Sequence, residues 1–260
     1  MLKISLLFAL AMPAMAQFRM QELAAGLGVV YAVRLADVNS DGKQDIVAIT
    51  GGKVIWYKNP TWEPKVISEG VAPKDHVSIA AHDINGDGRL DFALAAEWAP
   101  RERAVKGTLH WLEQKADGSF EMHNVAKIPG AHRMRWGDVN GDGKKELVVM
   151  PLEGKALVFS LPGWKAEVAA EGLELAHNLF LEDRDDDGAM EVVMASKAGV
   201  DTLKRGSDGT WTRIKTGDGQ PGEIQIGRIN GYRVAATIEA FHGDHLVIYE
   251  EPTPKLNPQG

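Results

Sequence analysis

The sequence predicts an all-β protein, a five-bladed β-propeller of four-stranded antiparallel blades. A nine-residue acidic segment occurs four times, with starts 46, 55 and 45 residues apart, and a period of this length is typical of repeat architectures. Short runs rich in Val, Ile and Leu flank each copy, as strands do between turns of Gly, Asn and Asp. Further apolar and aromatic runs bring the count to four strands per repeat, which is the blade of a propeller.

The strands of each repeat follow one order. The first strand ends at the acidic segment and the second begins just after it. The third carries a large apolar or aromatic pair, and the fourth begins with an aromatic residue. The first strands are expected at 31–36, 77–81, 134–136 and 179–181; the second at 46–49, 92–95, 147–150 and 192–194; the third at 55–57, 110–112, 158–159 and 247–249; the fourth at 62–70, 120–125, 164–172 and 211–215.

The two ends of the chain are expected to complete one blade together. Residues 18–26 have the pattern of a fourth strand, although no first three strands precede them. A fifth, eroded repeat begins near Gly227, has lost its carboxylates and ends after a third strand near Tyr249. We therefore expect the N-terminal strand to pair with the C-terminal blade and close the ring, which removes exposed strand edges.

Residues 1–16 have the pattern of a cleaved secretory signal. Lys3 precedes an apolar run over 4–12, and the small residues Ala14 and Ala16 precede Gln17. The run is shorter than the about 20 residues that cross a bilayer. We expect one propeller domain over 17–260, secreted or periplasmic, with no membrane span.

The composition excludes some classes of partner and some means of stabilising the fold. The chain has 260 residues, 29 Lys and Arg against 36 Asp and Glu, and no cysteine. The acidic balance argues against a nucleic-acid partner, and the lack of cysteine excludes disulfides and Cys-based metal centres.

The acidic segments have the spacing of calcium-binding loops. Side-chain oxygens recur at positions 1, 3, 5 and 9, with Gly at 6 and a backbone carbonyl at 7. Calcium takes six to eight oxygen ligands, whereas magnesium demands octahedral geometry and fits such a loop less well. The alternative is a set of polar turns rich in Asp-Gly and Asn-Gly. With about four Ca²⁺ expected, the assigned ligands are Asp37, Asn39, Asp41 and Asp45; Asp83, Asn85, Asp87 and Asp91; Asp138, Asn140, Asp142 and Glu146; Asp183, Asp185, Asp187 and Glu191; and the carbonyls of Lys43, Arg89, Lys144 and Ala189.

These segments resemble the FG-GAP/VCBS repeat family of secreted, calcium-binding β-propellers. The resemblance covers essentially the whole chain after the signal and implies the fold and the metal. It leaves the function open, because the family includes adhesins, lectins and sugar lyases. The last repeat, over 237–249, distantly resembles the closing segment of propellers of the aldos-2-ulose dehydratase group, which implies Glu239 and His242 as candidate catalytic residues.

A second group of candidate residues is expected on the face opposite the acidic loops. His76, His132 and His177 stand at the starts of first strands, six or seven residues before an acidic segment, and Tyr31 is their counterpart in the first repeat. Histidines that converge near the axis with His242 can bind a transition metal or act as acids and bases. The alternative is that each is a hydrogen-bonded turn residue.

The insertion over 97–103 adds candidate ligand-binding residues. Trp98, Arg101 and Arg103 can stack on a sugar and hold a carboxylate, or they form a solvated basic loop. We assign His76, Trp98, Arg101 and Arg103 to ligand binding, and His132, His177, His242 and Glu239 to catalysis.

Two functions remain open. The first is a monomeric, calcium-stabilised binding module, most plausibly for carbohydrate or another extracellular polymer. The second is a sugar-active lyase, dehydratase or isomerase in which histidines and Glu239 abstract a proton. After signal removal the formal charge is −8, which four Ca²⁺ would balance, so the face away from the metals can accept an acidic polysaccharide.

Overall fold

The computed structural model describes residues 19–229 and 232–250 and contains only strands and connecting loops there. Nineteen strands form five antiparallel sheets, and within each sheet the strands follow one another in chain order. The sheets contain β1 (Val30–Ala36), β2 (Asp45–Thr50), β3 (Lys53–Lys58) and β4 (Glu63–Glu69); β5 (Ser78–His82), β6 (Asp91–Ala96), β7 (Thr108–Gln114) and β8 (Phe120–Lys127); β9 (Ala131–Gly137), β10 (Glu146–Pro151), β11 (Glu153–Ser160) and β12 (Lys165–Glu174); β13 (Asn178–Glu182), β14 (Glu191–Ser196), β15 (Gly199–Arg205) and β16 (Trp211–Gly217); and β17 (Glu223–Ile229), β18 (Tyr232–Glu239) and β19 (His245–Glu250).

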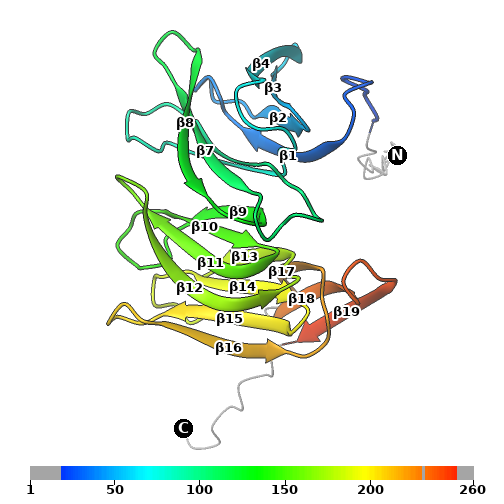
Figure 1. Ribbon diagram of the computed structural model, residues 1–260, viewed down its shortest axis with the longest axis vertical. Coiled ribbons are helices and arrows are strands. Elements are labelled where there is room, and N and C mark those ends of the chain that lie inside the picture. Colours follow the sequence, from blue (N-terminus) through cyan, green and yellow to red (C-terminus); the bar gives the residue numbers. More distant parts are fainter. Residues whose placement is uncertain (1–18, 230–231, 251–260) are drawn as a thin grey trace, which may run out of the picture.

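The first strands of the five sheets lie side by side in chain order. β1 contacts β5, β5 contacts β9, β9 contacts β13, and β13 contacts β17. Arg34 Nε donates to Ile79 O at 3.0 Å, which links β1 to β5, and Arg135 Nε donates to Leu179 O at 2.8 Å, which links β9 to β13. The sheets therefore follow one another around a line of first strands, in the manner of propeller blades (Figure 1).

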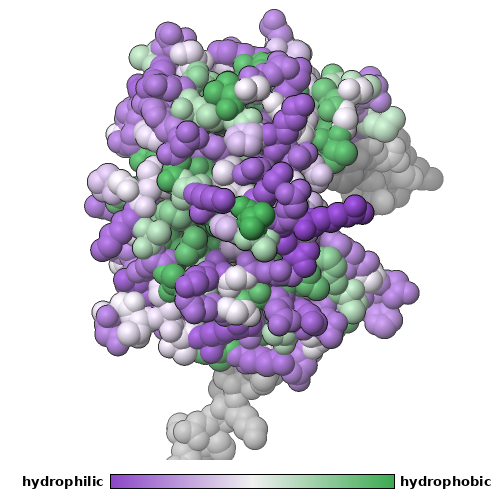
Figure 2. All heavy atoms as spheres, in the orientation of Figure 1, coloured by the Kyte–Doolittle hydropathy of each residue, from purple (hydrophilic) through white to green (hydrophobic). Residues whose placement is uncertain are grey.

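The core lies between neighbouring sheets. Every residue of β6, β10 and β14 is buried, because alternate side chains of a strand point to opposite faces and both faces of these sheets are covered. Val47 and Ile49 pack toward the second sheet, whereas Ala48 between them packs on the other face. This double burial explains why second strands appear in the sequence as continuous apolar runs. On the visible exterior, hydrophobic residues form only small patches among hydrophilic ones (Figure 2).

The prediction of an N-terminal strand is wrong over the residues of this segment that the structure describes. Residues 19–29 form no strand, and the fifth sheet has three strands, with β19 at its edge. The reason is that Leu23 and Leu27 pack against the outer face of the first sheet, around Ala48 and Ile55. The segment therefore covers that face and does not extend the fifth sheet. Phe18, the predicted signal over 1–16 and residues 251–260 lie outside the described residues.

The two end sheets keep exposed apolar side chains. Leu35 of β1 is 67% exposed and Leu246 of β19 is 77% exposed. The first strands β1 and β17 have no contact comparable to those between the other neighbouring first strands in the described part of the chain. The predicted closed ring is therefore an open arc in this structure, with β1 and β19 in its two end sheets (Figure 1).

One strand was missing from the sequence prediction. β15 forms the third strand of the fourth sheet, and its sequence mixes Val200 and Leu203 with Asp201, Thr202 and charged residues. It lacks the aromatic or large apolar pair that marks the other third strands. No helix in the described residues is long and apolar enough to cross a membrane.

Candidate functional site

A cavity of about 420 Å³ lies where the five first strands begin. Its wall takes one residue from the same position of every repeat, six residues before the first position of the acidic segment or its eroded equivalent. We call this cavity the axial pocket. The five equivalent residues are Tyr31, Val77, His132, His177 and Glu223.

The structure brings three of the predicted histidines together in the axial pocket. The ring centroids of His132 and His177 are 4.6 Å apart, and those of His177 and His242 are 4.4 Å apart. Trp98 extends the cluster, with its ring 4.6 Å from that of His132. Phe241 packs edge-on against His177 at 5.0 Å. The pocket therefore has a continuous wall of aromatic rings that also carry polar nitrogens.

Other predicted residues lie elsewhere. Glu239 does not line the axial pocket; its carboxylate accepts hydrogen bonds from Tyr249 Oη at 2.6 Å, Thr237 Oγ1 at 2.8 Å and the backbone N–H of Gln220 at 3.1 Å. Burial raises the pKa of Glu239, but these hydrogen bonds outweigh it and the pKa is lowered. Glu239 is thus a fully bonded structural carboxylate of the fifth sheet.

Most of the residues predicted to bind a ligand also lie outside the axial pocket. His76 is buried beside the pocket residue Val77 and does not line the cavity. Arg103 is held by Glu153 at 2.6 Å and by Pro100 O at 2.7 Å, and Arg101 is exposed and does not line the pocket. Of this group, only Trp98 lines the axial pocket.

His177 and Glu223 form an oriented pair. His177 Nδ1 is 2.7 Å from Gly222 O and 3.0 Å from Glu223 Oε1, so we assign its proton to Nδ1 and leave Nε2 as an acceptor. Asn178 Nδ2 also donates to Glu223. Burial raises the pKa of Glu223, but its contacts with His177 and the charge of Arg133 prevail and lower it. With its Nδ1–H directed in this way, the imidazole in its neutral form can accept a proton or a hydroxyl hydrogen bond at Nε2.

His132 is neutral in the folded protein. Burial lowers its pKa to about 2, and the charge of Arg133 acts in the same direction. Its Nδ1 has no hydrogen-bond partner among the described residues. Its Nε2 accepts from Arg133 Nη1 at 3.3 Å. A buried, neutral imidazole that packs on Trp98 in this way serves as part of an aromatic wall and not as a general acid.

The stability of the protein should fall as the pH decreases from 7 to 5, partly because of His132. Its folded-state pKa lies below the unfolded value of about 6.5, so the unfolded state binds the proton first, and the loss from this residue is about 2 kcal/mol. Urea unfolding of the wild type and of His132→Asn at both pH values measures the contribution of His132. The variant should lose less stability than the wild type when the pH is lowered. His245→Asn, at an exposed histidine, is the control. Equal losses in wild type and His132→Asn would contradict the assignment.

Sequence reasoning missed Glu223, Arg133 and Phe241. Glu223 occupies the position of His132 and His177 in the fifth repeat, but the loss of the acidic segment there removed the landmark from which the position is counted. Arg133 and Phe241 are next to predicted residues, and only the fold shows that they enter the pocket.

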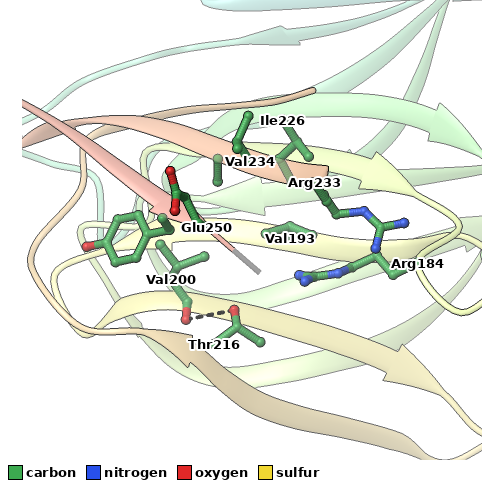
Figure 3. Close-up of a pocket in the computed structure, with 10 residues that line it drawn as sticks. Arg184, Val193, Val200, Thr216, Ile226, Arg233, Val234 and Glu250 are labelled. Atoms are coloured by element: carbon green, nitrogen blue, oxygen red, sulfur yellow. Dashed lines mark hydrogen bonds between the residues drawn. The ribbon is translucent and has the colours of Figure 1, made fainter. Parts of the chain in front are cut away.

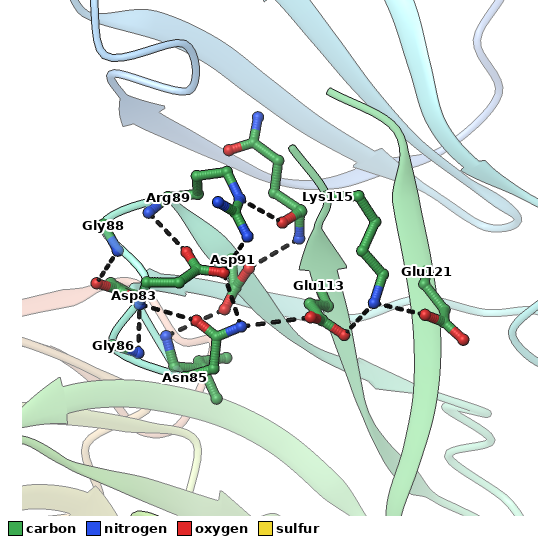
Figure 4. Close-up of polar contacts among 12 residues, drawn as sticks. Asp83, Asn85, Gly86, Gly88, Arg89, Asp91, Glu113, Lys115 and Glu121 are labelled. Atoms are coloured by element: carbon green, nitrogen blue, oxygen red, sulfur yellow. Dashed lines mark hydrogen bonds and ion pairs between the residues drawn. The ribbon is translucent and has the colours of Figure 1, made fainter. Parts of the chain in front are cut away.

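The four acidic loops share one hydrogen-bond pattern. The carboxylate at position 1 accepts the N–H of the Gly at position 6 at 2.8 to 3.0 Å. The carboxylate at position 5 accepts the N–H of position 7 at 2.8 to 3.0 Å. The buried carboxylate at position 9 accepts the N–H of position 2 at 2.8 to 3.2 Å. Figure 4 shows the hydrogen bonds of the second loop around Asp83, Asn85 and Asp91.

Two observations fit a bound cation in these loops. Carboxylate oxygens of Asp183, Asp185 and Asp187 lie within 4.8 Å of one another. Asn39 Oδ1 and Asp183 Oδ1, both predicted ligand atoms, are buried without a hydrogen-bond partner in the described residues. In the fourth loop, Lys204 Nζ also contacts Asp185 directly, and it lies 2.7 Å from Asp187 and 3.1 Å from Glu191. The donor set is that of a hard cation.

Two further features do not form comparable sites. Glu113, Glu121 and His123 converge, but Lys115 Nζ is 2.6 Å from both glutamates and forms an ion pair with each of them (Figure 4). A cavity of about 330 Å³ between the fourth and fifth sheets has mainly aliphatic walls, with Arg184 and Arg233 at one side (Figure 3). Arg233 is paired with Glu182 at 3.0 Å, and we interpret this cavity as a packing space between sheets.

Comparison with known proteins agrees with a β-propeller-like fold. Residues 37–94, from the first acidic loop into β6, match the model of the FG-GAP-like repeat. No curated protein matches the sequence.

Solved structures resemble the chain at low identity. An Agrocybe aegerita lectin that recognises non-reducing terminal N-acetylglucosamine is 15% identical with a TM-score of 0.53, over 84% of this chain and 65% of the lectin. The fission yeast SREBP–SCAP binding domains are 11% identical with a TM-score of 0.51, over 87% of this chain and 62% of that one. A chain of the yeast Nup82–Nup159–Nup116 nucleoporin complex is 8% identical with a TM-score of 0.51, over 86% of this chain and 75% of that one. The chain thus spans less than two thirds of the first two.

Proposed function

We propose that this protein is an extracytoplasmic binding module that holds a carbohydrate in the axial pocket. The observation that carries the proposal is the composition of the wall: the rings of Trp98, Tyr31 and Phe241 stand beside histidine nitrogens and the carboxylate of Glu223. Sugars present apolar C–H faces and hydroxyl edges, so aromatic rings with a few polar groups suit them. The lectin neighbour is an example of a similar fold used for sugar recognition.

We also propose that the acidic loops bind calcium. The ligands would be the side chains at positions 1, 3, 5 and 9 and the carbonyl at position 7 of each loop. Calcium would supply positive charge where acids crowd: burial and the charges of Asp142 and Asp138 raise the pKa of Glu146 to about 7. A cation there would stabilise the loop that joins the first two strands of each sheet, and so hold the first strands that form the axial pocket.

Replacing Trp98 should weaken sugar binding without unfolding the protein. Trp98→Ala removes the ring stacked on His132, and the loss of one aromatic contact corresponds to about a tenfold weaker affinity. A glycan array would find the ligand, and calorimetry on the best binder would give the affinity. Tyr232→Ala, at an exposed aromatic residue of β18 outside the pocket, is the control. If Trp98→Ala binds the sugar as tightly as the wild type, the sugar does not bind in the axial pocket.

A second candidate function is a sugar-active lyase, dehydratase or isomerase. It is favoured by the His177–Glu223 pair, in which Nδ1 is held at 3.0 Å from the carboxylate and Nε2 is left as an acceptor. His177 would take the proton alpha to a carbonyl, and Glu223 would stabilise the imidazolium that forms. Turnover of array-identified sugars, lost in His177→Gln and reduced in Glu223→Gln, would establish this function. Binding without turnover would leave the binding module as the function.

A further inference from the structure

Three arginines lie along the inner side of the first strands. Arg133 lines the axial pocket, one residue after His132. Arg34 and Arg135 stand three residues after the pocket residues of β1 and β9, which places them about 10 Å further along the strands at about 3.3 Å per residue. The axis therefore carries guanidinium groups from the pocket toward the acidic loops.

The charges of these arginines act on one another between sheets that are not neighbours. Arg34 belongs to the first sheet, whereas Arg133 and Arg135 belong to the third, with the second sheet between them. Burial lowers the pKa of Arg133 and Arg135, and the positive charge of Arg34 acts on both in the same direction. Arg133 Nη2 also lies 3.9 Å from Glu223 of the fifth sheet. Such influence between non-neighbouring sheets is expected only for side chains that face the common axis.

The positive charge of this group is not balanced by the described residues around it. Glu223 is the only carboxylate paired with any of the three in the described part of the chain, and it already accepts hydrogen bonds from His177 and Asn178. The Nε groups of Arg34 and Arg135 are fixed on backbone carbonyls of the next sheet. Their orientation is therefore set in advance. Arg34 Nη1 also donates to Val33 O at 3.2 Å, and among the described residues Arg34 Nη2 and both Nη groups of Arg135 remain to receive an anion.

We propose that the axial arginines bind the carboxylates of an acidic oligosaccharide, one of whose rings stacks on the aromatic wall of the axial pocket. This inference rests on the proposed carbohydrate site and specifies its ligand class. Arg133 and Trp98 line the same cavity, so one uronate residue can meet both. A planar carboxylate matches the guanidinium fork in two parallel hydrogen bonds. Charge interactions of half-buried groups are also less screened by salt than those at the surface.

The test compares trigalacturonate with its methyl ester, which keeps the sugar backbone and removes the negative charge. Calorimetry with the full-length calcium-loaded protein should show the acid binding at least about tenfold more tightly than the ester, as loss of a charge-assisted contact implies. Arg133→Gln and Arg135→Gln should each weaken binding of the acid by about tenfold and leave that of the ester unchanged. Arg228→Gln, at an exposed arginine of β17, is the matched control, and circular dichroism checks folding. If Arg135→Gln does not fold, Arg133→Lys replaces it in the test. Lysine keeps the positive charge but cannot form the two parallel hydrogen bonds of a guanidinium, so this variant should bind the acid more weakly than the wild type.

Each other outcome overturns the inference. Equal binding of acid and ester, lost in Trp98→Ala, would leave the carbohydrate site and reject the arginines as its anion receptor. Tight binding of the acid that survives both arginine substitutions would place the carboxylate elsewhere. If neither probe binds, the acidic-sugar inference is wrong, and the array experiment with Trp98→Ala still decides the proposed function on its own.

Discussion

Removal of calcium with a chelator is expected to lower the melting temperature on the order of 20 °C. A ligand that binds only the folded state stabilises it by about 2.7 kcal/mol at one hundred times its dissociation constant. Four such sites would contribute about 10 kcal/mol, and a domain of this size shifts by about 2–4 °C per kcal/mol. No disulfide can compensate, because the chain has no cysteine.

Differential scanning calorimetry of the protein with calcium, after chelation and after calcium is restored gives the measurement. Magnesium at the same concentration is the control ion, and it should restore little of the lost stability. Metal analysis should find about four calcium ions per chain. The fourth loop is the informative exception: Lys204 already contacts its acids, so Asp183→Asn should reduce the calcium effect less than Asp83→Asn. A melting temperature that is the same with and without chelator would contradict calcium in these loops.

The sequence predicts the elements whose local pattern is determined by burial on both sides. β6, β10 and β14 are buried along their whole length, and their apolar runs were sufficient to locate them. β15 was missed because its burial depends on neighbouring sheets while its composition is mixed. Residues 18–26 have a strand pattern, but a pattern does not specify a partner strand. In the described part of the chain, Leu23 and Leu27 pack on the first sheet instead.

The acidic loops could be predicted from local sequence pattern, whereas the axial pocket could not. The acidic loops repeat their residues because each makes the same local hydrogen bonds, so one copy explains the others. The axial pocket repeats a position and changes the residue, from Tyr31 to Val77, His132, His177 and Glu223. Such a site is visible only when the topology brings equivalent positions together. Positions that are structurally equivalent but chemically different are where this fold can acquire specificity.

Replacing the carboxylate at position 9 is expected to destabilise the protein even without calcium. In the second loop, Asp91 is fully buried; its Oδ2 accepts the N–H of Ile84 at 3.1 Å and its Oδ1 accepts that of Gln114 at 2.8 Å. It therefore ties the loop to the end of β7. Asp91→Ala would leave two buried N–H groups without partners, at about 1–3 kcal/mol each, so we expect a loss of about 3–5 kcal/mol.

The matched variant is Asp87→Ala at position 5 of the same loop. Asp87 is exposed, and its bond to Arg89 N at 2.9 Å is local. Urea unfolding of both variants, with calcium and with chelator, separates the two roles. Asp87→Ala should lose most of its stability difference from wild type when calcium is absent, whereas Asp91→Ala should keep most of its difference. If the effect of Asp91→Ala disappears on chelation, this carboxylate acts through the metal alone, and the hydrogen bonds to Ile84 and Gln114 are not what holds the loop to its sheet.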